Sequence, residues 1–495
     1  MTIKRTSGIL LPIFSLPSRY GIGTLGKEAY KFIDFLVEAN QSYWQVLPIG
    51  HTSYGDSPYQ AFSSFAGNPY FIDLDLLVQD GLLKRKELKE IWIEDLTRID
   101  YGYLYENRYP ILYKAYVRGI EKYRKGFEVF KEDNKWLYDY SMFMAIKKHF
   151  DMHSWLEWPD EAIRLRETKA LKQYEEMLKD DIEFYAFLQY LFYKQYLELK
   201  KYANDHGIGI IGDLPIYVSL DSCEVWAEPK QFQLEIETHV PKEVAGVPPD
   251  YFSSDGQLWG NPLYDWDYMK KDHYSWWKKR LEGVGKYFDV IRIDHFRGFQ
   301  AYWAVPYGAK TAKNGRWVDG PSKDFVDVLK NDFPNIQFIA EDLGDITEDV
   351  MELLKYSTFP GMRVLQFSMD PNGTSFHSPH HHVPNCICYI DTHDNVPIMG
   401  WVRTAKKEEL NYAKSYYGLN QKEGYNFSFI RAGMNSVAEL FVCQMQDYLG
   451  LDEKATINVP GTLGNWKWRL SGKELNKRLA KKISKIVHGC DRDRK

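Results

Sequence analysis

Three short stretches of the chain share one pattern, an apolar run that leads to an acidic residue. They are FDVIRID (288–294), QFIAE (337–341) and CICYIDTHD (386–394). Each run contains β-branched or aromatic residues and is bounded by polar or turn residues, which is typical of a buried parallel strand. The pattern therefore predicts three strands with Asp294, Glu341 and Asp394 at or just beyond their C-terminal ends.

Other segments predict the rest of an α/β chain. Apolar residues at helical spacing over 24–40 lead to a strand, SYWQVLPI (42–49), and GIGIIGDLPIYV (207–218) reads as the third strand. The runs at 288–294, 337–342, 361–367 and 386–391 read as strands four to seven. Amphipathic helices predominate between about 84 and 205, so we expect a helical insertion between the second and third strands. The prediction is one catalytic (β/α)8 TIM barrel over 1–495, with helical and loop insertions.

Acidic residues at the C-terminal ends of barrel strands are positioned for catalysis. Cleavage of a glycosidic bond with retention needs a carboxylate nucleophile and a carboxylic acid about 5–5.5 Å apart. Arg292 lies two residues before Asp294, on the same side of an extended strand, so we expect it to hold Asp294 ionised. Glu341 follows an apolar run, and desolvation there would raise its pKa. A single Asp after a strand is more often a helix cap or a turn residue, but three in one context favour a site.

At these residues the chain resembles the 4-α-glucanotransferases of glycoside hydrolase family 77, within the α-amylase superfamily. The resemblance rests first on RIDHFRG (292–298), AEDLG (340–344) and THDN (392–395). It extends through segments at 7–26, 42–50, 57–74, 212–218, 359–367 and 458–469. The most discriminating segment is VAGVPPDYFSSDGQLWGNPLYDW (244–266), which ordinary amylases do not resemble.

The resemblance implies a double displacement that transfers part of a 1,4-α-glucan to the 4-OH of glucose or of another glucan. It implies Asp294 as nucleophile, Glu341 as general acid and then base, and Asp394 as stabiliser of the transition state. It implies no metal and no cofactor. The substrate-binding residues that it implies are Ser57, Tyr59, Asp213, Gln257, Trp259, Asn261, Arg292, His295 and His393.

Two departures from the family pattern stand out. The family usually has Tyr-Thr-Gly before THDN, where this chain has Tyr389, Ile390 and Asp391. Asp255 occupies a position where Thr is common. Neither departure touches the three acids, so they bear on substrate preference more than on reaction type.

Aromatic residues make up 16% of the chain, and their faces can stack on a pyranose ring. About four in five should belong to the core. The candidates for glucan contact lie in Gly- and Pro-containing loops: Tyr59, Trp259 and, as a secondary contact, Tyr54. We also read 244–266 as a glucan-binding loop that closes on the substrate and favours transfer over hydrolysis.

Composition excludes several classes of partner. A net charge of −5 provides no basic field for nucleic acid, and no run approaches 18 apolar residues, so we expect no membrane partner. Five dispersed cysteines and the absence of a secretory leader indicate the reducing cytoplasm. His377, His380, His381 and His382 precede Cys386 and Cys388, but adjacent histidines cannot all face one ion, so we predict a polar loop and no metal.

The expected partners are maltooligosaccharides, amylose, starch or glycogen chains, and glucose as acceptor. Two alternatives remain open at this stage. One is a plain α-1,4-glucan hydrolase that uses the same three acids, because hydrolysis and transfer share their first step. The other is a non-catalytic glucan-binding protein, against which the presence of all three acids argues.

Overall fold

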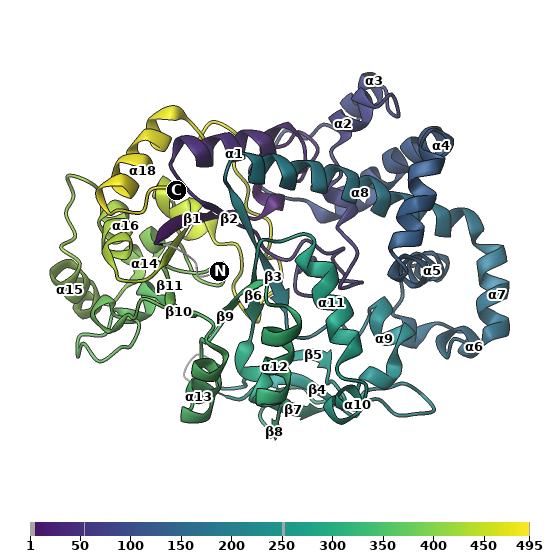
Figure 1. Cartoon of the computed structure of the whole chain (residues 1–495). Helices are drawn as coiled ribbons and strands as arrows, with labels where there is room; N and C mark the ends of the chain where they lie inside the picture. The colour runs from purple at the N-terminus through teal and green to yellow at the C-terminus, as the bar shows by residue number, and fades with distance from the viewer. Residues whose placement is uncertain (1–4, 54, 250–252, 495) are drawn as a thin grey trace.

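The computed structural model describes residues 5–53, 55–249 and 253–494. Its centre is a closed barrel of parallel strands in the order β1-β12-β11-β10-β9-β6-β3-β2 (Figure 1). The strands are β1 (Thr6–Leu10), β2 (Tyr43–Gln45), β3 (Gly209–Pro215), β6 (Val290–Asp294), β9 (Gln337–Ala340), β10 (Gly361–Val364), β11 (Cys386–Tyr389) and β12 (Leu440–Gln444). The predicted barrel is confirmed, and strands three to seven correspond to β3, β6, β9, β10 and β11.

Alternate strand residues fill the interior of the barrel. Ile211, Val290, Ile339, Ile387 and Val442 come from different strands and belong to one fully buried cluster. Successive residues of a strand point to opposite faces, so this apolar layer closes the barrel below the strand ends. Polar side chains at the C-terminal ends of the strands therefore lie above a packed floor.

Outside the segment between β2 and β3, helices follow most of the strands, and several of them, such as α1 and α18, cover the outside of the barrel (Figure 1). They are α1 (Lys27–Glu38), α9 (Cys223–Ala227), α10 (Trp266–Lys271), α11 (Ser275–Gly285), α12 (Ser322–Asp332), α13 (Glu348–Ser357), α14 (Ile398–Thr404), α15 (Lys407–Tyr416), α16 (Tyr425–Asn435), α17 (Met445–Leu449) and α18 (Lys477–Gly489). The first helix shows the pattern, since Ala29, Phe32, Ile33 and Leu36 are buried on one face. The helices α1 and α18 lie side by side, and pairing of β1 with β12 closes the barrel beneath them.

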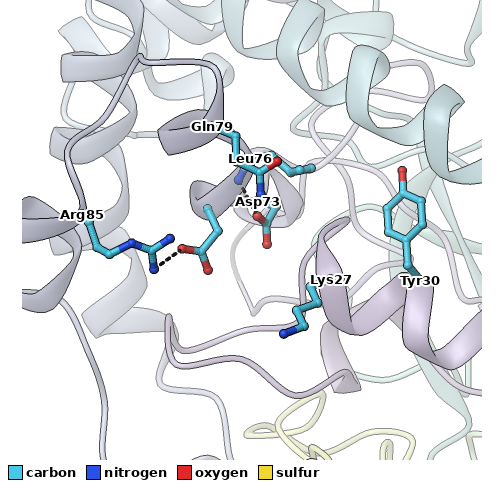
Figure 2. Close-up of a pocket in the computed structure, with 7 residues that line it drawn as sticks. Lys27, Tyr30, Asp73, Leu76, Gln79 and Arg85 are labelled. Atoms are coloured by element: carbon cyan, nitrogen blue, oxygen red, sulfur yellow. Dashed lines mark hydrogen bonds and ion pairs between the residues drawn. The ribbon is translucent and has the colours of Figure 1, made fainter.

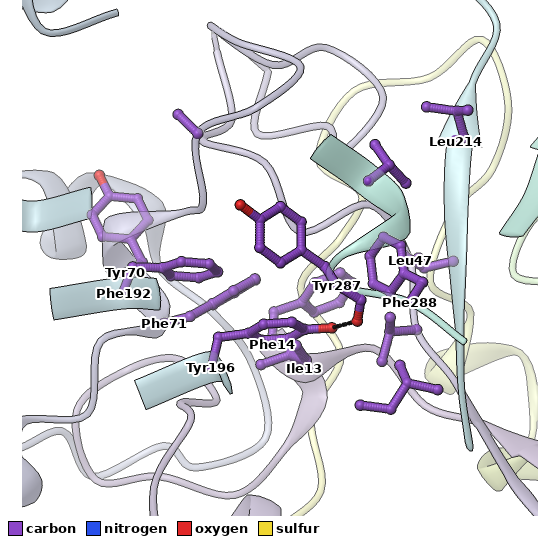
Figure 3. Packing of buried hydrophobic residues seen from close by; sticks show 14 of the residues in the cluster. Ile13, Phe14, Leu47, Tyr70, Phe71, Phe192, Tyr196, Leu214, Tyr287 and Phe288 are labelled. Atoms are coloured by element: carbon purple, nitrogen blue, oxygen red, sulfur yellow. Dashed lines mark hydrogen bonds between the residues drawn. The ribbon is translucent and has the colours of Figure 1, made fainter. Parts of the chain in front are cut away.

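A helical segment separates β2 from β3. It contains α2 (Leu74–Gln79), α3 (Arg85–Lys89), α4 (Tyr101–Asp133), α5 (Trp136–His149), α6 (Glu161–Arg164), α7 (Thr168–Met177) and α8 (Lys179–Asp205). Figure 3 shows aromatic residues of α8 packed beside the segment before β6, where the Tyr196 hydroxyl donates to the Tyr287 carbonyl oxygen at 3.0 Å. The rings of Tyr193 and Tyr287 stack with centroids 4.6 Å apart. This packing supports the proposal that insertion and barrel form one domain.

The interpretation of 244–266 as a loop was wrong for much of its length. The segment contributes β4 (Glu243–Val247) and β5 (Gln257–Pro262) to an antiparallel sheet with β7 (Ala301–Pro306) and β8 (Arg316–Asp319), in the order β5-β4-β7-β8. Its Gly and Pro residues obscured these strands, and β7, the second partner of β4, lies far along the chain. Strand pairing of that kind is not visible in a local pattern.

Candidate active site

The three acidic residues come from one end of the barrel. Asp294 is the last residue of β6, and Glu341 directly follows β9, the strand that pairs with β6. The Glu341 amide donates to the Ile293 carbonyl at 3.0 Å, so the ladder fixes the relative height of the two acids. Asp394 lies on the turn after β11 and is close enough to affect the pKa of Asp294. The structure therefore brings the three predicted carboxylates together.

Arg292 lies between the carboxylates of Asp213 and Asp294. Its Nη1 donates to both carboxylate oxygens of Asp213 at 2.7 Å, and its Nη2 lies 3.1 Å from Asp294 Oδ1. The arginine and Asp213 are almost fully buried. Burial has the largest effect and raises the pKa of Asp294 well above its usual value, while Arg292 opposes that rise. The predicted contact is present and acts in the predicted direction, but burial and three other acidic side chains act against it.

Glu341 is held by backbone donors. Its Oε2 accepts a hydrogen bond from the His295 amide, and its Oε1 accepts one from the Leu343 amide, both at 2.7 Å. His295 has a left-handed backbone (φ 56°), and this conformation accompanies the contact of its amide with Glu341. Burial raises the pKa of Glu341, as the apolar run suggested, although Arg292 and these two amides lower it. Burial also lowers the pKa of the His295 ring to about 3, so the ring is neutral near neutral pH.

Tyr59 connects Asp213 to the turn that carries Asp394. The Tyr59 hydroxyl donates to Asp213 Oδ2 at 2.6 Å and lies 2.8 Å from His393 Nε2. Since that hydroxyl hydrogen is already used, His393 Nε2 must be the donor to Tyr59. The two rings stack with centroids 5.3 Å apart. Asn458 Nδ2 donates to Asp394 Oδ1 at 2.6 Å, a contact that we did not predict, although Asn458 begins one of the segments behind the family resemblance.

The three predicted residues on β5 make different contacts. The Trp259 ring packs edge-on against the His295 ring, with centroids 4.8 Å apart, and its Nε1 donates to Gln257 Oε1 at 3.2 Å. Asn261 is 5% exposed, and its Nδ2 donates to the Val218 carbonyl at 2.7 Å. Trp259 therefore packs on His295, the residue whose amide contacts Glu341, whereas Asn261 fastens β5 to the segment after β3.

Ser57 lies two residues before Tyr59 in the chain. Ser57 Oγ accepts a hydrogen bond from the Tyr59 amide at 3.3 Å, which shapes the turn that presents the Tyr59 ring. Tyr54, the predicted secondary contact, lies outside the described residues.

The histidine cluster makes local contacts. His377 Nδ1 accepts from the Val364 amide at 3.2 Å, and His382 Nε2 donates to the His377 carbonyl at 2.8 Å. Within the described ranges, no three His, Cys, Asp or Glu side chains gather as they would around a metal ion. No helix in the described part of the chain is both long and apolar enough to cross a membrane.

A cavity of about 400 Å³ lies away from the acids, beside α1 and α2 (Figure 2). Lys27, Tyr30 and Gln79 line it, together with Arg85, which lies 3.5 Å from an Asp75 oxygen. None of the three strand-end acids contributes to this cavity. We therefore place the candidate active site at the barrel end and not here.

Comparison with known proteins supports the resemblance. The family model described as 4-alpha-glucanotransferase matches residues 11–476. The 4-alpha-glucanotransferase of Clostridium butyricum is 47% identical over 96% of this chain and 98% of its own length. That of Thermus thermophilus is 42% identical over 99% of this chain and 100% of its own.

Solved structures agree with this assignment. The amylomaltase from Streptococcus agalactiae, in complex with acarbose, superimposes with a TM-score of 0.97 and 41% identity, over 99% of this chain and 100% of that one. The amylomaltase from Corynebacterium glutamicum shares the fold, with a TM-score of 0.78 at 19% identity, over 99% of this chain and 75% of that one. The predicted resemblance is confirmed, and the chain belongs to the 4-alpha-glucanotransferase family, glycoside hydrolase family 77.

Proposed function

We propose that this 4-α-glucanotransferase acts by double displacement, with Asp294 as nucleophile and Glu341 as acid and then base. The observation behind this assignment is the placement of both carboxyl groups at the ends of paired strands, with Arg292 Nη2 3.1 Å from Asp294 Oδ1. Asp294 attacks C1 of a bound glucan while Glu341 protonates the departing glycosidic oxygen. Glu341 then deprotonates the 4-OH of an acceptor, which attacks C1 and releases Asp294.

The electrostatics of the site suit these roles. Burial raises the pKa of both carboxyl groups, and Glu341 adds to the rise at Asp294, so we expect the pair to hold one proton near neutral pH. Asp294 makes a charged contact with Arg292 at 3.1 Å, whereas Glu341 accepts from neutral amides. The charged contact favours the carboxylate more strongly. We therefore assign the shared proton to Glu341.

Asp394 is the most accessible of the three acids. Its side chain is 41% exposed and is oriented by Asn458 and His393. We propose that it binds sugar hydroxyls more tightly as the ring distorts toward the oxocarbenium ion. Tyr59 and Asp213 complete the wall of the same subsite.

Transfer requires an acceptor that competes with water. Well-oriented acceptors can reach effective molarities of about 10⁵ M or more, so positioning can suffice. We propose that Trp259, which packs on His295, covers the site and helps to hold the glucan together with Gln257. Asn261 supports this strand from below. Within the segment 244–266, β5 at the edge of the sheet is the part proposed to bind glucan, and residues 250–252 lie outside the described residues.

The proposed substrates are maltooligosaccharides and the chains of amylose, starch or glycogen, with glucose as an acceptor. The Streptococcus agalactiae amylomaltase was solved in complex with acarbose, which supports a sugar-like ligand for this chain. All five cysteines are free and buried, which agrees with a reducing cytoplasmic location.

Incubation with maltotriose alone tests the reaction type. We expect glucose and a ladder of longer maltooligosaccharides while the total of reducing ends stays constant. A rising total with only shorter products would instead identify a hydrolase. The Asp294→Asn variant should lose at least about 10⁴-fold in kcat while glucan affinity persists. The matched control is Asp345→Asn, whose side chain is 72% exposed, and it should keep its activity. Retained turnover in Asp294→Asn would reject the assigned nucleophile.

A further inference from the structure

Two buried aspartates lie side by side behind the turn that carries Asp394. Asp391 follows β11 at the position where the family pattern has Gly, and Asp447 lies in α17. Both side chains are 0% exposed. In residues 5–53, 55–249 and 253–494, no Lys, Arg or His lies within ion-pair distance of either. A buried acidic pair without a cation requires an explanation.

The contacts of the two carboxyl groups leave one position for a shared proton. Asp391 Oδ1 accepts from Gln444 Nε2 at 2.6 Å, and Asp447 Oδ1 accepts from the Ile398 amide at 2.8 Å. Asp391 Oδ2 accepts no hydrogen bond of normal geometry from the described residues. The Ile398 amide and the Asp447 carboxyl both lie close enough to affect Asp391. Two carboxylates only accept hydrogen bonds, so one of them must carry a proton for this contact to form.

The surroundings favour that protonated state. Burial raises the pKa of Asp447 to about 6 and that of Asp391 well above its usual value, and the charge of Asp447 adds to the rise at Asp391. The neighbouring titratable groups are Cys443 on β12 and Tyr448 on α17, and burial raises the pKa of both. Both side chains are therefore uncharged near neutral pH and add no charge to the surroundings of the pair.

The pair holds both ends of the segment 392–398. At one end, Gln444 Nε2 donates to the Thr392 carbonyl at 2.9 Å as well as to Asp391. At the other end, Asp447 accepts the amide of Ile398, the first residue of α14. His393 and Asp394 lie between these two anchors. Loss of the shared proton would place two like charges in contact below this turn.

We propose that Asp391 and Asp447 form a proton-sharing carboxyl pair that positions the His393–Asp394 turn, which makes Asp391 a positioning residue for glucan transfer. This inference rests on the proposed role of Asp394. It also gives a structural use to the departure from Gly at position 391. In the described part of the chain, Asp391 makes no hydrogen bond with Asp294 or Glu341, so we expect it to act through the turn.

Two substitutions at Asp391 separate the proton from the anchor. In Asp391→Asn, the amide nitrogen can donate to Asp447 at every pH, and the amide oxygen can still accept from Gln444. We expect this variant to keep kcat within about threefold of the parent protein, because the anchor survives. In Asp391→Ala both contacts are lost, and we expect kcat to fall about 10- to 100-fold with little change in KM, as for a displaced catalytic group. Rescue by Asn but not by Ala identifies the anchoring contact.

The pH dependence of unfolding tests the shared proton without substrate. A carboxyl whose pKa is raised in the folded protein binds a proton that the unfolded chain has released, so stability falls as pH rises between the two pKa values. Relative to Asp391→Asn, the unfolding equilibrium constant of the parent protein should increase about tenfold per pH unit in that window. For the comparison of kcat, the control is Asp73→Asn. Asp73 is a buried aspartate that caps the distant helix α2, and this variant should keep the kcat of the parent protein.

Equal pH slopes for the parent protein and Asp391→Asn would overturn the shared proton. Unchanged kcat in Asp391→Ala would overturn the positioning role, and if that variant does not fold, a large loss of kcat in Asp391→Asn would do so. Failure of the proposed function would appear separately, in the maltotriose products or in Asp294→Asn, because unfolding measurements involve no glucan.

Discussion

The Asp213→Asn substitution tests whether Asp213 tunes the nucleophile through Arg292. Arg292 Nη1 contacts both oxygens of Asp213, and Nη2 contacts Asp294. Asn keeps the size and one acceptor oxygen but removes the negative charge. The substitution leaves Arg292, an almost fully buried cation, with Asp294 as its charged partner.

The expected cost in stability follows from this burial. Removal of one partner from a buried ion pair costs about 3–5 kcal/mol of the free energy of unfolding. We expect Asp213→Asn to cost about 3 kcal/mol, because Asn keeps part of the hydrogen bonding. At roughly 2.1 cal/mol/K of unfolding entropy per residue, a chain of 495 residues loses about 1 °C of Tm for each kcal/mol. We therefore expect Tm to fall by about 3 °C.

The expected kinetic effect is a shift in the pH dependence of the reaction, and not only a loss of activity. The charge of Asp213 raises the pKa of Asp294, and Arg292 lowers it. Without that charge, Arg292 acts on Asp294 alone, so the pKa of Asp294 should fall. A nucleophile must be ionised in the free enzyme, hence the acid limb of kcat/KM should move to lower pH.

Maltotriose disproportionation measured across the acidic range, together with calorimetry near neutral pH, would test both effects. The matched control is Asp221→Asn. Asp221 pairs with the buried Lys147 at 2.6 Å, outside the barrel end, so its loss should lower Tm and leave the acid limb in place. An acid limb in Asp213→Asn that stays fixed or moves upward would refute the proposed coupling.

Two further predictions concern His51 and Trp259. Burial, aided by Lys147, lowers the pKa of His51 from 6.5 to about 3, so the unfolded chain takes up a proton first and stability is lost as pH falls through this window. In urea titrations at a series of pH values, His51→Gln should lose about 1.4 kcal/mol less per pH unit than the parent protein, and identical slopes would contradict this assignment. Trp259→Ala should raise the ratio of hydrolysis to transfer about two- to tenfold, since an aromatic contact such as that with His295 contributes roughly 0.5–1.5 kcal/mol. Trp317→Ala, on the same sheet, is the control, and an equal rise there would assign the effect to the sheet as a whole.

Local patterns in the sequence were sufficient for the barrel strands that end near acids. The runs before Asp294 and Glu341 are short and apolar, and they form β6 and β9. Amphipathic spacing likewise predicted the long helices between β2 and β3. The strands β1 and β12 were not assigned from the sequence.

Local sequence patterns did not predict contacts between residues that lie far apart in the chain. The pairing of β4 with β7 turned an expected loop into a sheet. The contact of Asn458 with Asp394 joins residues that are 64 positions apart. Register and burial depend on the whole set of neighbours, so no short window contains them.

The sequence by itself was sufficient to predict three acidic residues at strand ends, a barrel to hold them, and the resemblance to the family to which the chain belongs. Those properties follow from residue identity and short-range periodicity. The tertiary structure decided the electrostatic surroundings of the buried acids. Burial raises the pKa of Asp294 while Arg292 lowers it, and Asp391 acquires a carboxyl partner in Asp447. Desolvation and charge coupling arise only when distant segments exclude water together, which is why the fold was needed to assign them.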